Sequence, residues 1–174
     1  MSKKELIVFI DSGDTIVEEG TQIWEDGLVL SADLIEGADE MMRTLHEKGY
    51  RVALVADGRT QSFVNVYNQH DLNHVFEKWV ISEEEGVEKP HQQMFEQALI
   101  RMGLTEEDKK RIVMVGNNVK RDVLGANDFG ITSILIDYSP RYNMVPENDA
   151  ETPDYTITWP LELLPLLEEI EASL

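Results

Sequence analysis

The sequence predicts an α/β fold in which a mainly parallel sheet lies between two layers of helices. Short apolar runs rich in β-branched residues are typical of strands buried on both faces, and helical patterns separate these runs. Strands are expected at 6–10, 52–55, 112–115 and 131–136, with weaker candidates at 79–81 and 155–157. Because strands alternate with helices, right-handed crossovers should build a three-layer α/β/α sandwich.

Apolar spacing and end signals predict the helices between these strands. The expected helices are 37–49, 61–70, 90–103, 119–129 and 161–172. In the first of them, Met41, Met42 and Leu45 fall on one face, as core residues of an amphipathic helix do. The 90–103 segment has proline at its first turn and glycine at its end, which is the usual asymmetry of helix termini.

One segment, at about 16–36, departs from this alternation. Asp26-Gly27 separates Ile23-Trp24 from the apolar residues 28–30, and an Asp-Gly pair in this setting predicts a β-hairpin. A small flap should therefore follow the first strand. The 174 residues suit one domain, so we expect 1–174 to form a single unit that includes the flap.

Composition narrows the classes of partner. Asp and Glu number 34 against 15 Lys and Arg, which gives a net charge of −19. Nucleic acids and anionic membranes are held chiefly by Lys and Arg, so neither is an expected partner. The chain has no cysteine and no apolar stretch near the roughly 18 residues of a membrane helix, and the cytoplasm is the expected location.

Polar residues follow the predicted strands where their carboxyl ends should meet. They are the segments 11–15, 56–60 and 116–118, with Asp122 and the Glu88-Lys89-Pro90 segment nearby. Ligands of open α/β sheets bind at this edge. Carboxylates, a lysine and backbone N–H groups together are what metal-assisted phosphoryl transfer requires.

The order of these segments resembles the haloacid dehalogenase superfamily over nearly the whole chain. FIDSGDTI resembles the D-x-D-x-T pattern that follows the first strand, and VALVADG takes the place of the second motif. GVEKPHQQMFEQAL carries the lysine of the third motif, and MVGNNVKRD resembles the final G-D-x-x-x-x-D pattern.

This resemblance implies a role for each matching residue. Asp11 would be the nucleophile, and Lys89 would clamp the nucleophile and the phosphate. The phosphate-binding positions would be Ala56, Asp57, Gly58 and Lys89, and the Mg²⁺ ligands would be Asp11, the Gly13 carbonyl, Asn117 and Asp122.

Three positions depart from the family pattern. Gly13 replaces the second aspartate, the usual general acid and base, whose contribution is typically about 10²–10⁴-fold. Ala56 replaces a serine or threonine that would bind phosphate, and Asn117 replaces an aspartate, so the cation would lose a negative ligand. A slow or altered enzyme would follow.

Other side chains have two interpretations. Asp14 or Asp57 could replace the missing acid, although Asp14 should point away unless the loop bulges at Gly13. Asp57 and Arg59 could orient substrate or form a solvent-facing pair in a turn, and Arg141, in the long polar loop 137–154, could reach an anionic substrate or remain a surface arginine. His70 and His74 are spaced like zinc ligands but have no evident third ligand.

The intervals between the motifs leave room for a flap and one crossover, but not for a cap domain. The resemblance therefore implies a capless member with an open site, covered only if the 137–154 loop or another subunit of a homo-oligomer lies over it. Capless relatives tend to act on macromolecular or bulky phosphorylated substrates or to oligomerise. The partner that the resemblance implies here is a phosphorylated substrate, small or macromolecular.

The leading interpretation is thus a cytoplasmic Mg²⁺-dependent phosphatase that forms an aspartyl-phosphate. The alternative is a catalytically impaired pseudo-enzyme that acts as a binding or regulatory protein. Metal-free dehalogenase chemistry is a third interpretation, but it would need a cap to desolvate the substrate.

Overall fold

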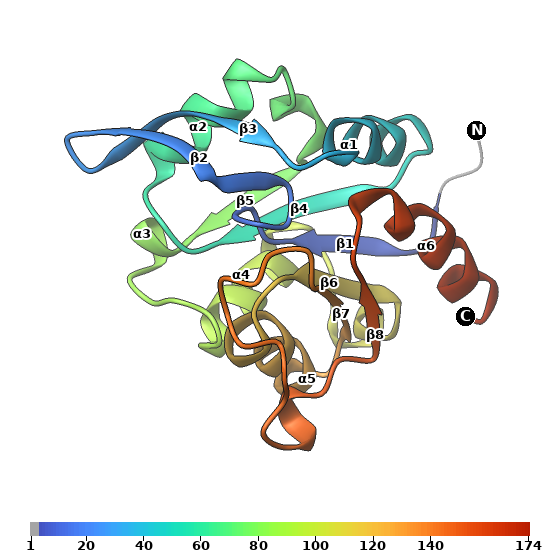
Figure 1. The fold of residues 1–174 in the computed structure, drawn as a ribbon. Coiled ribbons are helices and arrows are strands. Elements are labelled where there is room, and N and C mark those ends of the chain that lie inside the picture. The colour runs from blue at the N-terminus through green and yellow to red at the C-terminus, as the bar shows by residue number, and fades with distance from the viewer. Residues whose placement is uncertain (1–3) are drawn as a thin grey trace.

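A computed structural model describes residues 4–174 and contains a six-stranded parallel sheet of order β5-β4-β1-β6-β7-β8 (Figure 1). The strands are β1 (Ile7–Ile10), β4 (Arg51–Ala56), β5 (Lys78–Ile81), β6 (Ile112–Gly116), β7 (Thr132–Ile136) and β8 (Tyr155–Ile157). The four stronger strand predictions and the two weaker ones are all confirmed.

Helices connect the strands in the predicted order. They are α1 (Ala38–Glu47), α2 (Thr60–Gln69), α3 (Ser82–Glu85), α4 (Gln92–Arg101), α5 (Leu124–Phe129) and α6 (Leu163–Ala172). Short 3-10 turns occupy Asn73–Val75, Glu106–Arg111, Asp149–Glu151 and Pro160–Glu162, and a π-helical turn occupies Val119–Val123.

Two predicted helix starts need correction. We expected Pro90 in the first turn of the 90–103 helix, but α4 begins at Gln92, because the His91 side chain caps it by accepting a hydrogen bond from the Gln93 N–H. The predicted 119–129 helix is α-helical only from Leu124, after the π-helical turn.

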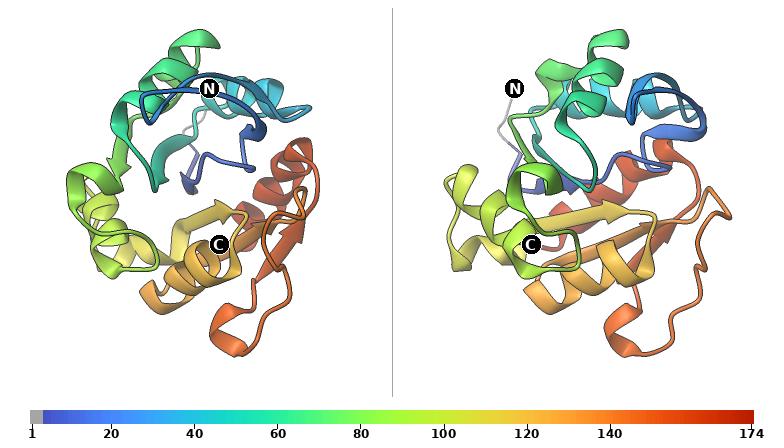
Figure 2. Two further views of the ribbon diagram at one scale, coloured as in Figure 1. Left: turned by 60° about the vertical axis from the view of Figure 1, so that its left-hand side comes forward. Right: turned by 90° about the vertical axis from the view of Figure 1, so that its left-hand side faces the viewer.

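The helices form two layers, one on each face of the sheet (Figure 2). Val8 and Ile10 of β1 belong to the core that contains α1 and α6, whereas Ile7 and Phe9 belong to the core that contains α4 and α5. This alternation explains why the strand sequences are apolar throughout. The predicted three-layer α/β/α sandwich is confirmed.

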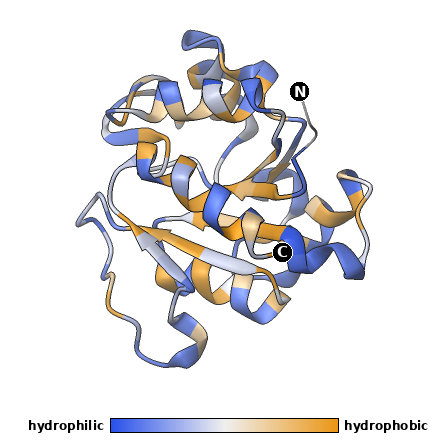
Figure 3. Cartoon of the chain, turned by 90° about the vertical axis from the view of Figure 1, so that its right-hand side faces the viewer, coloured by the Kyte–Doolittle hydropathy of each residue, from blue (hydrophilic) through white to orange (hydrophobic). Residues whose placement is uncertain are grey.

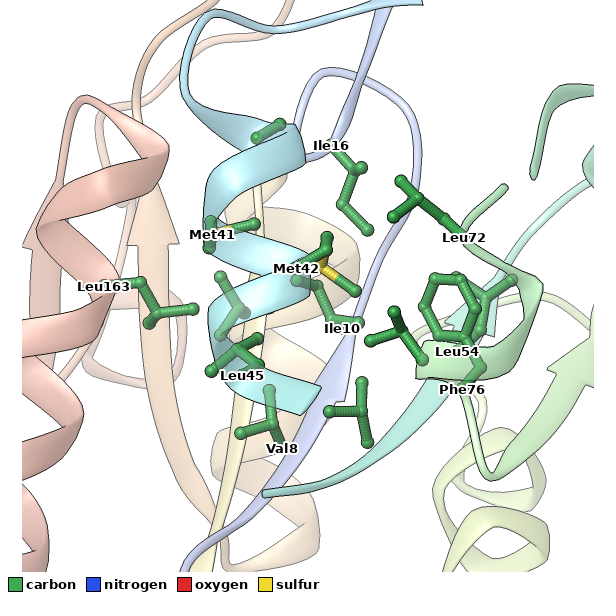
Figure 4. Close-up of a cluster of buried hydrophobic side chains, with 14 of the residues drawn as sticks. Val8, Ile10, Ile16, Met41, Met42, Leu45, Leu54, Leu72, Phe76 and Leu163 are labelled. Carbon is green, nitrogen blue, oxygen red and sulfur yellow. The ribbon is translucent and has the colours of Figure 1, made fainter. Parts of the chain in front are cut away.

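The larger core lies under α1. Figure 4 shows Met42 and Leu45 beside Ile10 and Val8 of β1, and Met41 on the side of α1 near Leu163 of α6. All three α1 side chains are buried, as the helical spacing predicted. In Figure 3 the central strands are mainly hydrophobic, while the surface helices alternate between hydrophobic and hydrophilic residues.

The predicted flap is a separate two-stranded hairpin of β2 (Val17–Glu25) and β3 (Leu28–Leu34) (Figure 1). Its turn residues Asp26 and Gly27 have φ of 52° and 78°, the left-handed pair that a tight hairpin turn requires. Both backbone polar groups of Val29 in β3 are hydrogen-bonded to side chains of α2. Its N–H donates to Ser62 Oγ (3.0 Å), and its carbonyl accepts from Asn65 Nδ2 (2.9 Å).

The topology places a ligand site at the carboxyl end of β1. The chain passes from β1 to β4 and β5 on one side, then crosses back to β6 on the other, so the strand order reverses beside β1. Binding crevices of open parallel sheets lie at such reversal points. Within residues 4–174 the flap is the only folded unit outside the sandwich, and no helix is long and apolar enough to cross a membrane.

Candidate active site

A cavity of about 450 Å³ opens at the carboxyl ends of β1, β4 and β6. Its lining includes Asp11, Glu19, Asp57, Lys89, Asn117 and Asp122. The residues that the sequence predicted to converge at this edge are therefore neighbours, with Glu19 as an addition from the flap.

Lys89 is the centre of this cavity's hydrogen-bond network. Its Nζ donates to Asp11 Oδ1 (2.9 Å), Asp122 Oδ1 (2.7 Å) and the Val55 carbonyl at the end of β4 (2.8 Å). All three donor hydrogens of the ammonium group are thus used. The side chain of Lys89 is 1% exposed and that of Asp11 14%, so Asp11 is the member of this group that a ligand can reach.

The charges of this network shift two pKa values. Burial alone would lower the pKa of Lys89, but Asp11, Asp122 and Asp57 raise it above its ordinary value, so the ammonium stays charged. Burial, and then the charge of Asp11, raises the pKa of Asp122 to about 7, although Lys89 opposes the shift. The site therefore carries more negative charge than one lysine balances.

Two local features hold Asp122 in place. Its Oδ2 accepts a hydrogen bond from the Asn118 N–H (3.1 Å) at the start of the π-helical turn. The same carboxyl packs on Gly116, where an added Cβ would lie 2.3 Å from Cγ and from Oδ2 of Asp122. Glycine ends β6 at this point because any side chain would occupy the volume of the carboxylate.

We expect Gly116→Ala to displace Asp122 from Lys89 and to lower the free energy of unfolding by about 1–3 kcal/mol, the usual cost of overpacking. Urea unfolding measures this change. Gly20→Ala is the matched control, since an added Cβ there meets no atom within 4 Å. Equal stabilities of the two variants would contradict this account of Gly116.

The predicted phosphate-binding segment after β4 is only partly available to a ligand. Asp57 Oδ1 accepts a hydrogen bond from the Lys89 backbone N–H (3.0 Å), and Asp57 Oδ2 accepts one from Arg121 Nη1 (3.2 Å). Asp57 therefore holds the loop that carries Lys89 in place. The Gly58 N–H donates to Ser82 Oγ (2.8 Å), so this donor is occupied, and its use for phosphate stays a prediction. Ala56 is buried in the last position of β4 and does not line the cavity.

Asp57 and Arg59 do not form the pair that we considered. Arg59 instead binds Glu83 on α3 (3.2 Å). Arg121, which the sequence analysis did not single out, binds Asp57 and also Glu88 (2.9 Å). Arg121 also lines the cavity, and its guanidinium is paired with these two carboxylates.

The candidate metal ligands are oxygen donors that line the cavity. Asp11, Gly13, Asn117 and Asp122 all line it. Asn117 is 2% exposed and its Nδ2 has no hydrogen-bond partner within residues 4–174, so no other residue there fixes the amide. Carboxylate and amide oxygens suit a hard cation such as Mg²⁺, and a cation would also relieve the excess negative charge, so these residues fit the ion.

The described residues contain no cluster of side chains of the kind that binds zinc. Among the described residues, no three or more His, Cys, Asp or Glu side chains are grouped so that they could hold a metal. His70 instead bonds the Ala32 carbonyl (2.7 Å), and His74 packs edge-on against His46. These contacts give no support to a zinc site at His70 and His74.

The loop after Asp11 turns over residues 14–16, just after Gly13, and it directs Asp14 away from the cavity. Asp14 has φ of 52°, and its Oδ2 accepts a hydrogen bond from Arg141 Nε (2.7 Å). It does not line the cavity. Arg141 is therefore not a free surface arginine, since it ties the 137–154 loop to Asp14 and to Glu19 (3.1 Å).

Glu19 of β2 contacts Gly13 directly. A Cβ added at Gly13 would lie 1.8 Å from Glu19 Oε1, so the carboxyl occupies the place of a side chain at position 13. Burial, and then the nearby charge of Asp14, raises the pKa of Glu19, while Arg141 opposes this. Sequence inspection missed Glu19 because it falls in a flap strand whose position over Asp11 no local pattern encodes.

The flap also forms one side of the cavity. Gln22, Trp24 and Gly27 of the flap line it together with Tyr142 of the 137–154 loop. The site is consequently more enclosed than the sequence analysis expected.

Comparison with known proteins settles the family. The model of haloacid dehalogenase-like hydrolases matches residues 4–130, which include every motif described above. The chain belongs to this family. It is 34% identical over 126 residues to the glyceraldehyde 3-phosphate phosphatase of Methanopyrus kandleri, an alignment that covers 72% of this chain and 53% of that protein.

Solved structures of haloacid dehalogenase-like hydrolases share the fold. A HAD phosphatase from Thermococcus onnurineus superposes with a TM-score of 0.74 at 17% identity, over 93% of this chain and 97% of that one. The HAD-hydrolase YfnB from Bacillus subtilis, solved bound to magnesium, gives a TM-score of 0.68 at 22% identity, over 78% and 56% of the two chains. The present chain spans about half the length of the first curated relatives that it matches.

Proposed function

We propose that this protein is a Mg²⁺-dependent phosphatase that hydrolyses phosphate monoesters through a phosphoryl-Asp11 intermediate. One observation carries the proposal. Asp11 presents a partly exposed carboxylate to the cavity, and its Oδ1 is 2.9 Å from the buried Lys89 Nζ. The phosphatase relative that is 34% identical to this chain supports the same chemistry.

In this proposal, the free oxygen of Asp11 attacks phosphorus and the ester oxygen leaves. Lys89 is bonded to Oδ1, so the other oxygen, Oδ2, remains for attack. The fixed ammonium orients the carboxylate and stabilises the negative charge that gathers on the phosphoryl oxygens. Arg121, on the cavity wall, adds a second positive group.

Asp11, the Gly13 carbonyl, Asn117 and Asp122 are the residues that would hold Mg²⁺. A bound divalent cation would neutralise phosphoryl charge and orient the phosphate. Asn117 supplies a neutral oxygen where an aspartate would supply a charge, so we expect weaker Mg²⁺ binding than a third carboxylate would give.

The cavity supports a small substrate. Its volume of about 450 Å³ falls in the range of roughly 300–1,000 Å³ typical of small-molecule pockets. The flap and Tyr142 would contact the part of the molecule beyond the phosphate. Given the net charge of −19, we propose a phosphorylated small molecule rather than nucleic acid or a membrane lipid as partner, and the cytoplasm as location.

Hydrolysis of an aryl phosphate by the wild-type protein tests this function. We expect turnover with Mg²⁺ and its loss with a chelator, because an aryl leaving group needs little protonation and the assay depends on nucleophile and cation alone. Restoration by added Mg²⁺ controls for damage by the chelator. If the wild-type protein showed no turnover with Mg²⁺ or other divalent metals, the alternative of a binding protein would replace this proposal. The residues Gly13, Ala56 and Asn117, which depart from the family motifs, would then explain the lost activity.

A further inference from the structure

Hydrolysis of an alkyl phosphate needs a group that moves protons beside the nucleophile. The alkoxide leaving group must be protonated, and the attacking water must later lose a proton. Four carboxyl side chains line the cavity, namely Asp11, Glu19, Asp57 and Asp122. The contacts of each decide which one can serve.

Three of the four are already committed. Asp11 is the proposed nucleophile. Both oxygens of Asp122 are bonded, to Lys89 and to the Asn118 N–H, and its side chain is 2% exposed. Both oxygens of Asp57 are bonded as well, to the Lys89 N–H and to Arg121.

Glu19 differs from these three. Its Oε2 is paired with Arg141, but its Oε1 faces Gly13, two residues after Asp11. The side chain is 28% exposed and lines the cavity, so a bound ester could reach it. Gly13 is the residue that leaves room for this carboxyl, since an added Cβ would lie 1.8 Å from Oε1.

We propose that Glu19, delivered by the flap, is the catalytic acid and base of this active site. The inference rests on the proposed phosphatase function. As Asp11 forms its bond to phosphorus, the P–O ester bond breaks and the Glu19 carboxyl gives its proton to the departing oxygen. Water then attacks phosphorus, its proton returns to Glu19, and the Asp11–phosphorus bond breaks to release phosphate.

Glu19→Gln separates these two steps when an aryl phosphate is used with Mg²⁺. The first step needs little acid, so the variant should release a rapid burst of one equivalent of aryl alcohol per enzyme. Steady-state turnover should then fall by about 10²–10⁴-fold, because the second step lacks its base. With an alkyl phosphate the burst should be absent, since the leaving group then requires the acid.

Glu18→Gln is the matched control. Glu18 is the preceding residue on the same strand, and its Oε1 accepts a hydrogen bond from Tyr138 (2.7 Å) instead of lining the cavity. We expect this variant to retain wild-type turnover with both substrates.

A relocated carboxyl provides a second test. Gly13→Asp combined with Glu19→Ala removes the side chain that a new Cβ at position 13 would meet, and we expect turnover well above that of Glu19→Ala alone. Two results would overturn the role of Glu19 but leave the proposed phosphatase function intact. One is wild-type turnover by Glu19→Gln. The other is an equal loss of turnover with both substrates, with no burst and with no recovery in the Gly13→Asp/Glu19→Ala variant. An inert wild-type protein would overturn both proposals.

Discussion

Asp11→Asn is expected to lower aryl phosphate turnover by at least about 10⁴-fold, because an amide oxygen cannot form the covalent intermediate. The substitution keeps the shape of the side chain and an oxygen that can accept from Lys89. The remaining ion pair between Lys89 and Asp122, at 2.7 Å, should keep the site folded. Steady-state kinetics with Mg²⁺ measures the loss, and acid-quenched protein should carry radiolabelled phosphate only in the wild type.

Asp128→Asn, at an exposed position of α5, controls for a general effect of removing one negative charge. This control should match the wild type in turnover and in labelling. Retention of turnover by Asp11→Asn within about tenfold of the wild type would show that another group attacks phosphorus.

Local sequence patterns were sufficient for the sheet, the main helices and the flap. Strands such as β1 contribute side chains to both cores, so their sequences are apolar throughout and easily recognised. The Asp26-Gly27 turn needs two left-handed residues, which few other pairs provide. Asp11 was identifiable because it directly follows β1 at the ligand-binding edge. Lys89 and Asp122 were identified by their places in the motifs of the family that the sequence resembles.

The remaining features depend on contacts between distant segments. Glu19 and Arg141 are far apart in the sequence and meet only because the flap and the 137–154 loop both fold over Asp11. The Gly58 N–H could not be known to bind Ser82, which comes from the following strand–helix unit. Gly116 has no unusual backbone angle. Glycine is required at this position because the Asp122 carboxyl packs against it, and this contact cannot be recognised from the sequence.

Lys89→Met is expected to lower the free energy of unfolding by about 3–5 kcal/mol, the usual cost of removing one partner from a buried ion pair. Methionine is apolar and of similar length, so the effect is mainly electrostatic. Asp11 and Asp122 would then repel each other without a counter-charge, and the Val55 carbonyl would lose its donor. Urea unfolding measures the change.

The destabilisation by Lys89→Met should depend on pH. Because burial and Asp11 already raise the pKa of Asp122 to about 7, loss of Lys89 should raise it further. Both folded proteins then bind a proton that the unfolded chain has released, so the stability of both falls as pH rises from about 5 toward 7. Above about pH 7 only the variant keeps this proton, so its destabilisation relative to the wild type should be larger at pH 8 than at pH 5. Lys110→Met, at an exposed lysine, should change stability by less than about 0.5 kcal/mol at either pH. If Lys89→Met lowered the stability equally at both pH values, the effect would come from lost packing and not from repulsion between the Asp11 and Asp122 carboxylates. The site would then not hold the excess negative charge that the proposed Mg²⁺ ion would neutralise.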